Sequence, residues 1–351
     1  METIDLHTHI LPERWPDLAE RYGYGDWLRM ESIGGCRARL YQGERFFREI
    51  EDNCWSPARR LEDCAATGVD VQVLSTVPVM FSYWARPADA YDLARLLNDH
   101  IAGVVAEHPT RFEGLATLPM QHAELAIREL ERAVAPASRG GLGLRGVQVG
   151  THVNGMNLYH DALQPIFEAA AELSAAVFVH PWDMLARERM SRYWMPWLVG
   201  MPAETCLAAC DLMFGGVLER LPKLRVCMAH GGGSLAGTIG RIEHGYHARP
   251  DLCAGDSKRS PLQYLARPGA GGAEPTPARF WVDSLVHDAT VLRALLTLFT
   301  PRRIALGTDY PFPLGEARPG ELIDSLTEIA AADRAWLRGG AAREFLGARE
   351  R

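Results

Sequence analysis

Lysine is nearly absent from this chain, because only two of its 37 basic residues, Lys223 and Lys258, are lysines. The other basic residues are arginines spread along a chain with a formal net charge of −7. No basic stripe is visible, and nucleic-acid-binding proteins carry clustered positive charge. We therefore expect no nucleic-acid partner.

Long apolar runs and a disulfide pattern are also missing. No apolar run reaches the roughly 18 residues of a membrane helix, and no charged-then-apolar leader opens the sequence. The seven cysteines are odd in number and scattered through predicted helices, strands and loops, which favours reduced thiols. We therefore expect a cytoplasmic protein with no membrane partner.

The chain does contain a rhythm of short, β-branched strands that alternate with amphipathic helices. The predicted strands cover residues 4–10, 69–77, 112–118, 146–151, 176–180, 224–229, 279–283 and 303–309. Such alternation indicates a parallel sheet that helices cover. Eight units in 351 residues predict one α/β domain, a TIM-like (β/α)8 barrel, with a doubly wound open sheet or two packed domains as alternatives.

Two segments interrupt the rhythm. Residues 11–55 are polar, aromatic and punctuated by glycines, which predicts an insertion of loops and short strands after the first strand. Residues 267–277 are rich in Gly, Pro and Ala and predict a mobile loop before the seventh strand. After the insertion, Ser56 and Pro57 are typical of a helix start, and Gly68 of its end.

Histidines and an aspartate stand at the predicted strand ends. His7 and His9 lie one residue apart on the first strand, so their side chains share a face. Alone, this pair favours two surface histidines near the terminus over a metal site. His180, His230 and Asp309 end the fifth, sixth and eighth strands. Because these ends converge in a barrel, the five side chains together predict a metal centre.

The predicted ligands suit one particular class of ion. Imidazoles and one carboxylate, without a nearby thiolate, favour zinc, with iron, manganese or cobalt as replacements. Many barrels of this kind bridge two metals with a carbamylated lysine at the end of strand four. The fourth strand, 146–151, has no lysine, and neither Lys223 nor Lys258 is near a strand's C-terminal end. We therefore predict a single ion with an open coordination position.

His230 is the candidate base. Four of the five side chains would satisfy one ion, which leaves one imidazole to accept a proton from a metal-bound water. Three glycines, 231–233, follow His230 and lead into a predicted helix, so a substrate could approach the backbone there. A plain tight turn explains these glycines equally well.

With these residues in view, the chain resembles the amidohydrolase superfamily, and in particular its decarboxylase branch, over nearly its whole length. The resemblance rests on the runs 5–12, 74–84, 179–184, 194–205 and 306–316. Residues 267–277 and 154–157 depart from the family pattern, but neither segment contains a predicted ligand.

The resemblance implies a role for each matching residue. One zinc ion per subunit would be held by His7, His9, His180 and Asp309, with His230 as general acid and base. Arg48 matches an arginine that holds a substrate carboxylate, and Trp197 a tryptophan beside the substrate. Arg241 matches an arginine supplied by the neighbouring subunit, which implies a homodimer. Two guanidinium groups would suit a small dicarboxylate substrate. For Trp194 we expect core packing.

The implied activity is non-oxidative, zinc-dependent decarboxylation by a carboxy-lyase in tryptophan or 2-nitrobenzoate breakdown. Three alternatives remain: a related decarboxylase of a hydroxybenzoate, a metal-dependent hydrolase or hydratase, and a barrel that only binds a ligand. Release of carbon dioxide, as opposed to incorporation of water, would separate the first two classes.

Overall fold

The computed structural model describes residues 2–269 and 273–347. At its centre, eight parallel strands follow one another in the order β1, β5, β6, β7, β10, β11, β12 and β13. Their bounds are Ile4–Ile10, Val71–Thr76, Phe112–Ala116, Gly146–Gly150, Ala176–His180, Arg225–Met228, Trp281–Asp283 and Ile304–Ala305. The sequence-based prediction of a (β/α)8 barrel is thereby confirmed.

The first and last strands close the sheet on itself. Leu6 N–H donates to the Leu306 carbonyl at 2.8 Å, and Asp309 N–H donates to the His7 carbonyl at 2.8 Å. The regular part of β13 covers only two residues, shorter than the predicted strand 303–309. These bonds keep the following residues beside β1, so Asp309 still lies next to His7.

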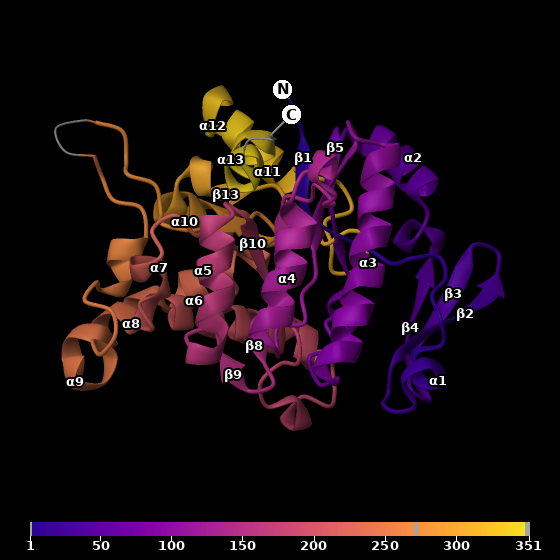
Figure 1. Ribbon diagram of the computed structural model, residues 1–351. Helices are drawn as coiled ribbons and strands as arrows, with labels where there is room; N and C mark the ends of the chain where they lie inside the picture. Colours follow the sequence, from indigo (N-terminus) through magenta and orange to yellow (C-terminus); the bar gives the residue numbers. More distant parts are fainter. Residues whose placement is uncertain (1, 270–272, 348–351) are drawn as a thin grey trace.

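Helices surround the barrel (Figure 1). Those that follow the strands of the barrel are α3 to α13, with α6 and α7, and α8 and α9, as consecutive pairs. Their bounds are Pro87–Glu107, Ala123–Val134, Gln164–Glu172, Met201–Phe214, Val217–Arg220, Leu235–Ala248, Pro250–Cys253, Ala289–Phe299, Glu321–Ser325, Ala331–Ala335 and Ala341–Leu346. Between β1 and β5, the helix α2 (Pro57–Thr67) begins as predicted, because the Ser56 side chain caps it and left-handed Gly68 ends it.

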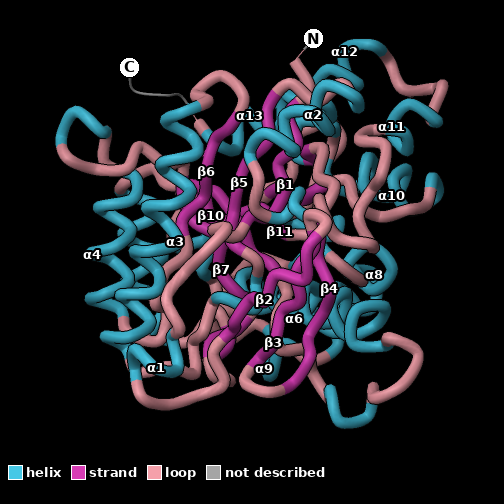
Figure 2. The backbone as a smooth tube through the Cα atoms, turned by 90° about the vertical axis from the view of Figure 1, so that its right-hand side faces the viewer, coloured by secondary structure: helices cyan, strands magenta, loops and turns pink. Residues whose placement is uncertain are grey.

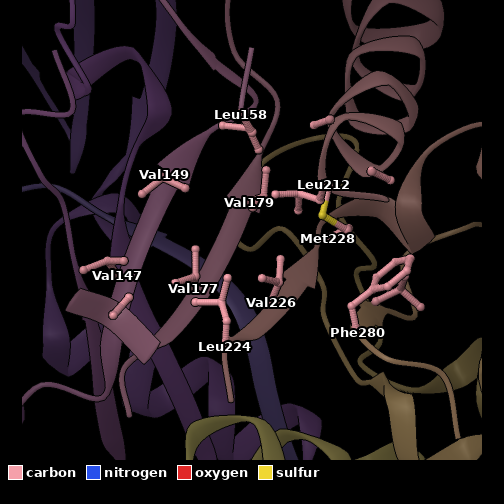
Figure 3. Packing of buried hydrophobic residues seen from close by; sticks show 14 of the residues in the cluster. Val147, Val149, Leu158, Val177, Val179, Leu212, Leu224, Val226, Met228 and Phe280 are labelled. Atoms are coloured by element: carbon pink, nitrogen blue, oxygen red, sulfur yellow. The ribbon is translucent and has the colours of Figure 1, made fainter. Parts of the chain in front are cut away.

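Alternate residues of each strand build two apolar layers. Val147 and Val149 of β7, and Val177 and Val179 of β10, face the surrounding helices and pack in one cluster with Leu212 of α6 (Figure 3). Their neighbours, such as Phe178, point into the barrel and form a separate cluster with α13 residues. Because side chains fill the interior, the polar chemistry is confined to the ends of the barrel.

Residues 11–55 form a small antiparallel sheet beside the barrel (Figures 1 and 2). It comprises β2 (Leu28–Gly34), β3 (Arg37–Gln42) and β4 (Arg45–Glu51), preceded by the short helix α1 (Leu18–Tyr22). Leu28, Leu40 and Ile50 share a buried cluster with residues that follow β5. A second addition, the hairpin β8 (His152–Val153) and β9 (Met156–Asn157), follows β7. Both additions therefore lie where the barrel strands end.

Part of the predicted mobile loop 267–277, residues 270–272, lies outside the described residues. At its base, Arg267 and Thr276 form an antiparallel bridge with backbone hydrogen bonds of 3.1 and 2.9 Å.

One helical stretch, Pro196–Phe214, is long and apolar enough to span a membrane by length and composition. Glu204 and Asp211 interrupt this stretch, so it is not the uninterrupted apolar run that the sequence excludes. In its apolar 18-residue window, 56% is buried inside the protein, as in the core helix of a barrel.

Candidate metal centre and substrate pocket

The five predicted side chains meet at one end of the barrel. His7 and His9 come from β1, His180 ends β10, and His230 and Asp309 follow β11 and β13. His7 Nε2 lies 3.2 Å from His9 Nε2, and His9 Nε2 lies 3.0 Å from Asp309 Oδ1. The ligand atoms of His7, His180, His230 and Asp309 all lie within 4.8 Å of one another. The structure therefore brings the whole predicted set together.

Hydrogen bonds assign the protons of three of the imidazoles. His7 Nδ1 faces Asp283 Oδ2 at 2.7 Å, His9 Nδ1 faces the Thr76 carbonyl at 3.0 Å, and His180 Nδ1 faces the Pro181 carbonyl at 2.9 Å. Each partner is an oxygen acceptor, so each Nδ1 carries the hydrogen and each Nε2 presents a lone pair. Burial lowers the pKa of His180 well below its usual value, which keeps that imidazole neutral.

Three Nε2 lone pairs thus point at one buried space, together with a carboxylate. Two nitrogen lone pairs 3.2 Å apart repel each other unless a cation or proton lies between them. His180 Nε2 and Asp309 Oδ1 are buried without a hydrogen-bond partner among the described residues. These unpaired atoms fit a metal ion, for which neutral imidazole and carboxylate are common ligands.

His230 differs from the other three histidines. Its Nδ1 is buried and has no partner among the described residues, and its Nε2 lies 3.9 Å from Asp309 Oδ2. Burial favours the neutral ring, but the negative charge of the nearby Asp309 outweighs burial and raises the pKa of His230. Both His230 and Asp309 have positive φ, at 53° and 57°, and non-glycine residues hold such backbone mostly at functional sites.

The three glycines after His230 form a tight turn. All have positive φ, and a Cβ on Gly233 would lie 2.2 Å from the Pro202 carbonyl oxygen. Ser234 N–H donates to the same carbonyl at 3.0 Å. The close approach of α6 thus accounts for Gly233, which supports the tight-turn explanation of this segment.

Sequence reasoning missed Asp283, the last residue of β12. Its Oδ2 accepts from His230 N–H at 2.9 Å and faces His7 Nδ1, while its Oδ1 accepts from Gly231 N–H at 2.8 Å. One buried carboxylate therefore orients a candidate ligand and the backbone of the candidate base. Its position at the end of the seventh strand was the available signal, because the other predicted site residues occupy the same kind of position.

Arg48 borders a pocket above the metal centre, which we name the aromatic pocket. Its other lining residues are His9, Phe47, Val77, Pro78, His180, Trp182, Trp194, Trp197, Met201, Asp309, Phe312, Pro313 and Leu314. The pairing of β3 with β4 slips at Phe47, and such a bulge re-aims the next side chain. The Arg48 guanidinium lies 4.5 Å from the Phe312 ring centre. Burial lowers the pKa of Arg48, and no described carboxylate pairs with it, so an anion would be favoured beside it.

Trp197 lines the aromatic pocket, but the expectation that Trp194 packs in the core is wrong. Trp194 is 42% exposed, its ring centre lies 5.9 Å from that of Trp197, and it lines the same pocket. It leaves the core because residues 181–200 connect β10 to α6 across the mouth of the barrel. Trp182 and Phe312 also line this pocket.

A second cavity of about 230 Å³ adjoins the aromatic pocket at the metal centre. It shares Trp197, Met201 and Asp309 with the aromatic pocket and adds His230 to its lining. His230 therefore faces a space large enough for part of a small substrate.

Arg241 does not reach this site within one chain. It is exposed on α8 and lines neither cavity. Lys223 and Lys258 are both exposed, and the end of β7 carries no lysine. Thus no lysine bridges a pair of metals among the residues that the structure describes.

The comparisons with known proteins agree with this geometry. The amidohydrolase family model matches residues 4–348. The 2-amino-3-carboxymuconate-6-semialdehyde decarboxylase of Dictyostelium discoideum is 54% identical over 98% of this chain and 91% of its own length. The protein of the same name from Caenorhabditis elegans is 36% identical over 94% of this chain and 90% of its own length.

A solved structure shares the fold. The dihydroxybenzoic acid decarboxylase of Polaromonas sp. JS666, with bound manganese and the inhibitor 2-nitroresorcinol, superimposes with a TM-score of 0.74. It is 23% identical, and the match covers 98% of this chain and 96% of that one.

Proposed function

Because this chain belongs to the amidohydrolase family and is a decarboxylase, we propose that it converts 2-amino-3-carboxymuconate 6-semialdehyde to 2-aminomuconate 6-semialdehyde and carbon dioxide. The substrate assignment is supported by the relative from Dictyostelium discoideum, which bears the name of this activity at 54% identity. The same step would serve tryptophan or 2-nitrobenzoate degradation.

We propose zinc as the ion, held by His7, His9, His180 and Asp309. The single observation that carries this assignment is the set of three Nε2 lone pairs that converge beside Asp309. When bound, zinc supplies a Lewis acid that lowers the pKa of a water molecule and polarises substrate oxygens. Manganese, iron or cobalt could occupy the same ligands.

Arg48 and the aromatic side chains bind and orient the substrate. A guanidinium in the aromatic pocket can hold a carboxylate with two parallel hydrogen bonds. Trp197 and Trp194 cover the flat, conjugated chain and exclude water from it. Carboxylate binding there leaves the reacting end of the substrate toward the metal centre and His230.

His230 transfers the proton that the reaction needs. Decarboxylation breaks a carbon–carbon bond, releases carbon dioxide and replaces the carboxylate with a proton on carbon. The imidazole Nε2 faces Asp309 and the second cavity, so it can take up a proton and return it to the substrate carbon. Asp283 holds the His230 backbone in place during this exchange.

We further propose that the enzyme works in the cytoplasm as a homodimer in which Arg241 of one subunit contributes to the site of the other. The exposure of Arg241 on α8, outside both cavities, supports this arrangement. The seven free cysteines agree with a reducing compartment.

The test is a spectrophotometric assay with freshly generated substrate, together with measurement of carbon dioxide. We expect zinc-loaded protein to release carbon dioxide in step with the loss of substrate absorbance. His230→Ala should retain zinc and lose turnover, because the proton carrier is gone. Turnover by a zinc-loaded His230→Ala variant would refute the role of His230.

One observation favours a second candidate, decarboxylation of a hydroxybenzoate. The aromatic pocket would also accept a ring, and the Polaromonas enzyme of this fold acts on dihydroxybenzoic acid. Parallel assays with 2,6-dihydroxybenzoate would separate the two substrates. Incorporation of labelled water into product without release of carbon dioxide would instead indicate a hydrolase or hydratase.

A further inference from the structure

Residues 181–200, which we name the strap, carry a large share of the aromatic pocket. The strap runs from His180 at the end of β10 to the start of α6 and contributes Trp182, Trp194 and Trp197 to the pocket lining. The positions of these tryptophans in the pocket therefore depend on the contacts that hold the strap in place.

Few interactions within the strap stabilise its backbone conformation. Asp183, Ala186, Tyr193 and Trp194 all have positive φ, between 51° and 62°, which is unfavourable for residues with side chains. Met184 is buried, but Leu185 beside it is 49% exposed, so packing holds this part of the strap through few side chains. Such a segment persists only when contacts from outside over-determine it.

Two hydrogen bonds join residues 182–195 to described residues outside the strap. Leu185 N–H donates to Glu204 Oε1 at 2.7 Å, and His152 Nε2 donates to the Asp183 carbonyl at 3.0 Å. Glu204, in the first turn of α6, is only 2% exposed, and its Oε2 also accepts from Thr151 Oγ1 at 3.3 Å. A bond from a backbone amide to a buried carboxylate is the stronger kind of anchor.

A buried carboxylate costs stability unless its hydrogen bonds repay the loss of water. A leucine at position 204 would fill the same space without that cost, but it could not bind the Leu185 amide. We propose that Glu204 is a positioning residue, which fixes the strap through Leu185 so that Trp194 and Trp197 wall the substrate pocket. This inference rests on the proposed function, because it assumes that the aromatic pocket binds the substrate.

The first test measures the strap without any substrate. The strap contains Arg187, Arg189 and Arg192, of which the last two are exposed, so trypsin can report its release. Glu204→Ala should speed cleavage after Arg189 and Arg192 by about tenfold or more, as expected for loss of a bond to a charged group. Glu204→Gln, which keeps an acceptor oxygen, should stay near the wild-type rate.

A matched control is available on the same helix. Asp211 lies two turns after Glu204, is also buried, and accepts from Asn157 Nδ2 of the β9 strand at 3.2 Å, not from the strap. Asp211→Ala should therefore leave cleavage within the strap unchanged. Equal acceleration by Asp211→Ala, or a wild-type rate in folded Glu204→Ala, would overturn the proposal.

A second variant removes the other half of the anchor. Leu185→Pro deletes the N–H donor at an exposed position and leaves the core of α6 intact, so it tests the same bond if Glu204→Ala fails to fold. We expect the same pattern of cleavage as for Glu204→Ala. Cleavage confined to sites outside the strap would contradict the proposal.

Kinetics then connect the strap with the substrate. Because the tryptophans contact the substrate both before and during the reaction, Glu204→Ala should raise KM by about tenfold with kcat nearly unchanged. Glu204→Gln should restore KM, and the zinc content should not change. If wild-type protein does not turn over the proposed substrate, the proposed function fails while the proteolysis result still decides the role of Glu204.

Discussion

The two ends of the barrel both contain buried charge, but they arrange it in opposite ways. At the N-terminal end, Glu113 binds Arg145 at 3.1 Å and Arg343 at 2.6 Å, and Arg343 also binds Glu2. These residues border a cavity of about 570 Å³. Glu2 and Gly347, the first and last described residues, both border this cavity. At the C-terminal end, His180 Nε2 and Asp309 Oδ1 are buried without a hydrogen-bond partner among the described residues.

The difference teaches where function can reside. Opposite charges that neutralise each other inside one chain stabilise the fold and leave no affinity for a ligand. Like groups that converge without a partner destabilise the free protein. The imidazole lone pairs at the metal centre create affinity for a cation, and Arg48, which has no ion pair among the described residues, creates affinity for an anion. The larger cavity is therefore structural, whereas the smaller cavities at the mouth carry the chemistry.

Removal of the ion should have the largest effect and should affect only the mouth. We expect dialysis against a chelator to reduce turnover by about a thousandfold or more, because the Lewis acid is lost. Far-ultraviolet circular dichroism should remain native, since the barrel core does not contain the ion. Restoration of turnover by zinc, with binding measured by atomic absorption, completes the test. Unchanged turnover in demonstrably metal-free protein would exclude a catalytic metal.

Asp283→Ala should weaken the metal centre without removing a ligand. This carboxylate orients His7 and receives the His230 and Gly231 amides, so its loss should lower zinc affinity by about 10- to 100-fold. Competition with a chromophoric chelator measures that affinity. Wild-type affinity in the variant would show that His7 needs no support from Asp283.

Arg343→Ala should damage the opposite end. The variant leaves Glu113 with only one of its two arginines, and we expect a loss of about 2 kcal/mol in the free energy of unfolding. The zinc content and KM should not change. Arg318→Ala, which breaks an exposed pair with Glu321, is the matched control and should cost less than about 0.5 kcal/mol. A changed KM in Arg343→Ala would mean that the two ends are linked.

Asp211→Asn should alter the pH dependence of stability and little else. Burial raises the pKa of Asp211 from 3.8 to about 7, so the folded protein holds a proton there that the unfolded chain releases between these values. The stabilisation is thus complete below about pH 4 and is lost as pH rises toward 7. The variant should flatten this part of a plot of melting temperature against pH. An identical slope in both proteins would place the ionisation elsewhere.

Local patterns in the sequence predict the barrel and its metal residues well. Alternation of β-branched strands with amphipathic helices reports burial on both faces, which depends on each segment's own residues. The parallel direction of the strands then brings His7, His180, His230 and Asp309 to one end. Helix caps such as Ser56 and Gly68 are equally local, and the structure confirms them.

The remaining features depend on partners that are distant along the chain. Asp283 pairs with His7 across 276 residues, and Glu204 acts on a strap whose backbone no residue pattern describes. Trp194 has a large apolar side chain of the kind that usually packs in a core, but the strap carries it to the mouth of the barrel.

The order and chemical types of its residues alone determined that this protein is a barrel with a cluster of imidazoles at its C-terminal end. The closure of β1 against β13, the slip in β4 that aims Arg48, and the anchoring of the strap were decided only in three dimensions. The physical reason is that strand ends converge in any parallel barrel, whereas hydrogen bonds between distant segments exist only after packing has fixed their distances.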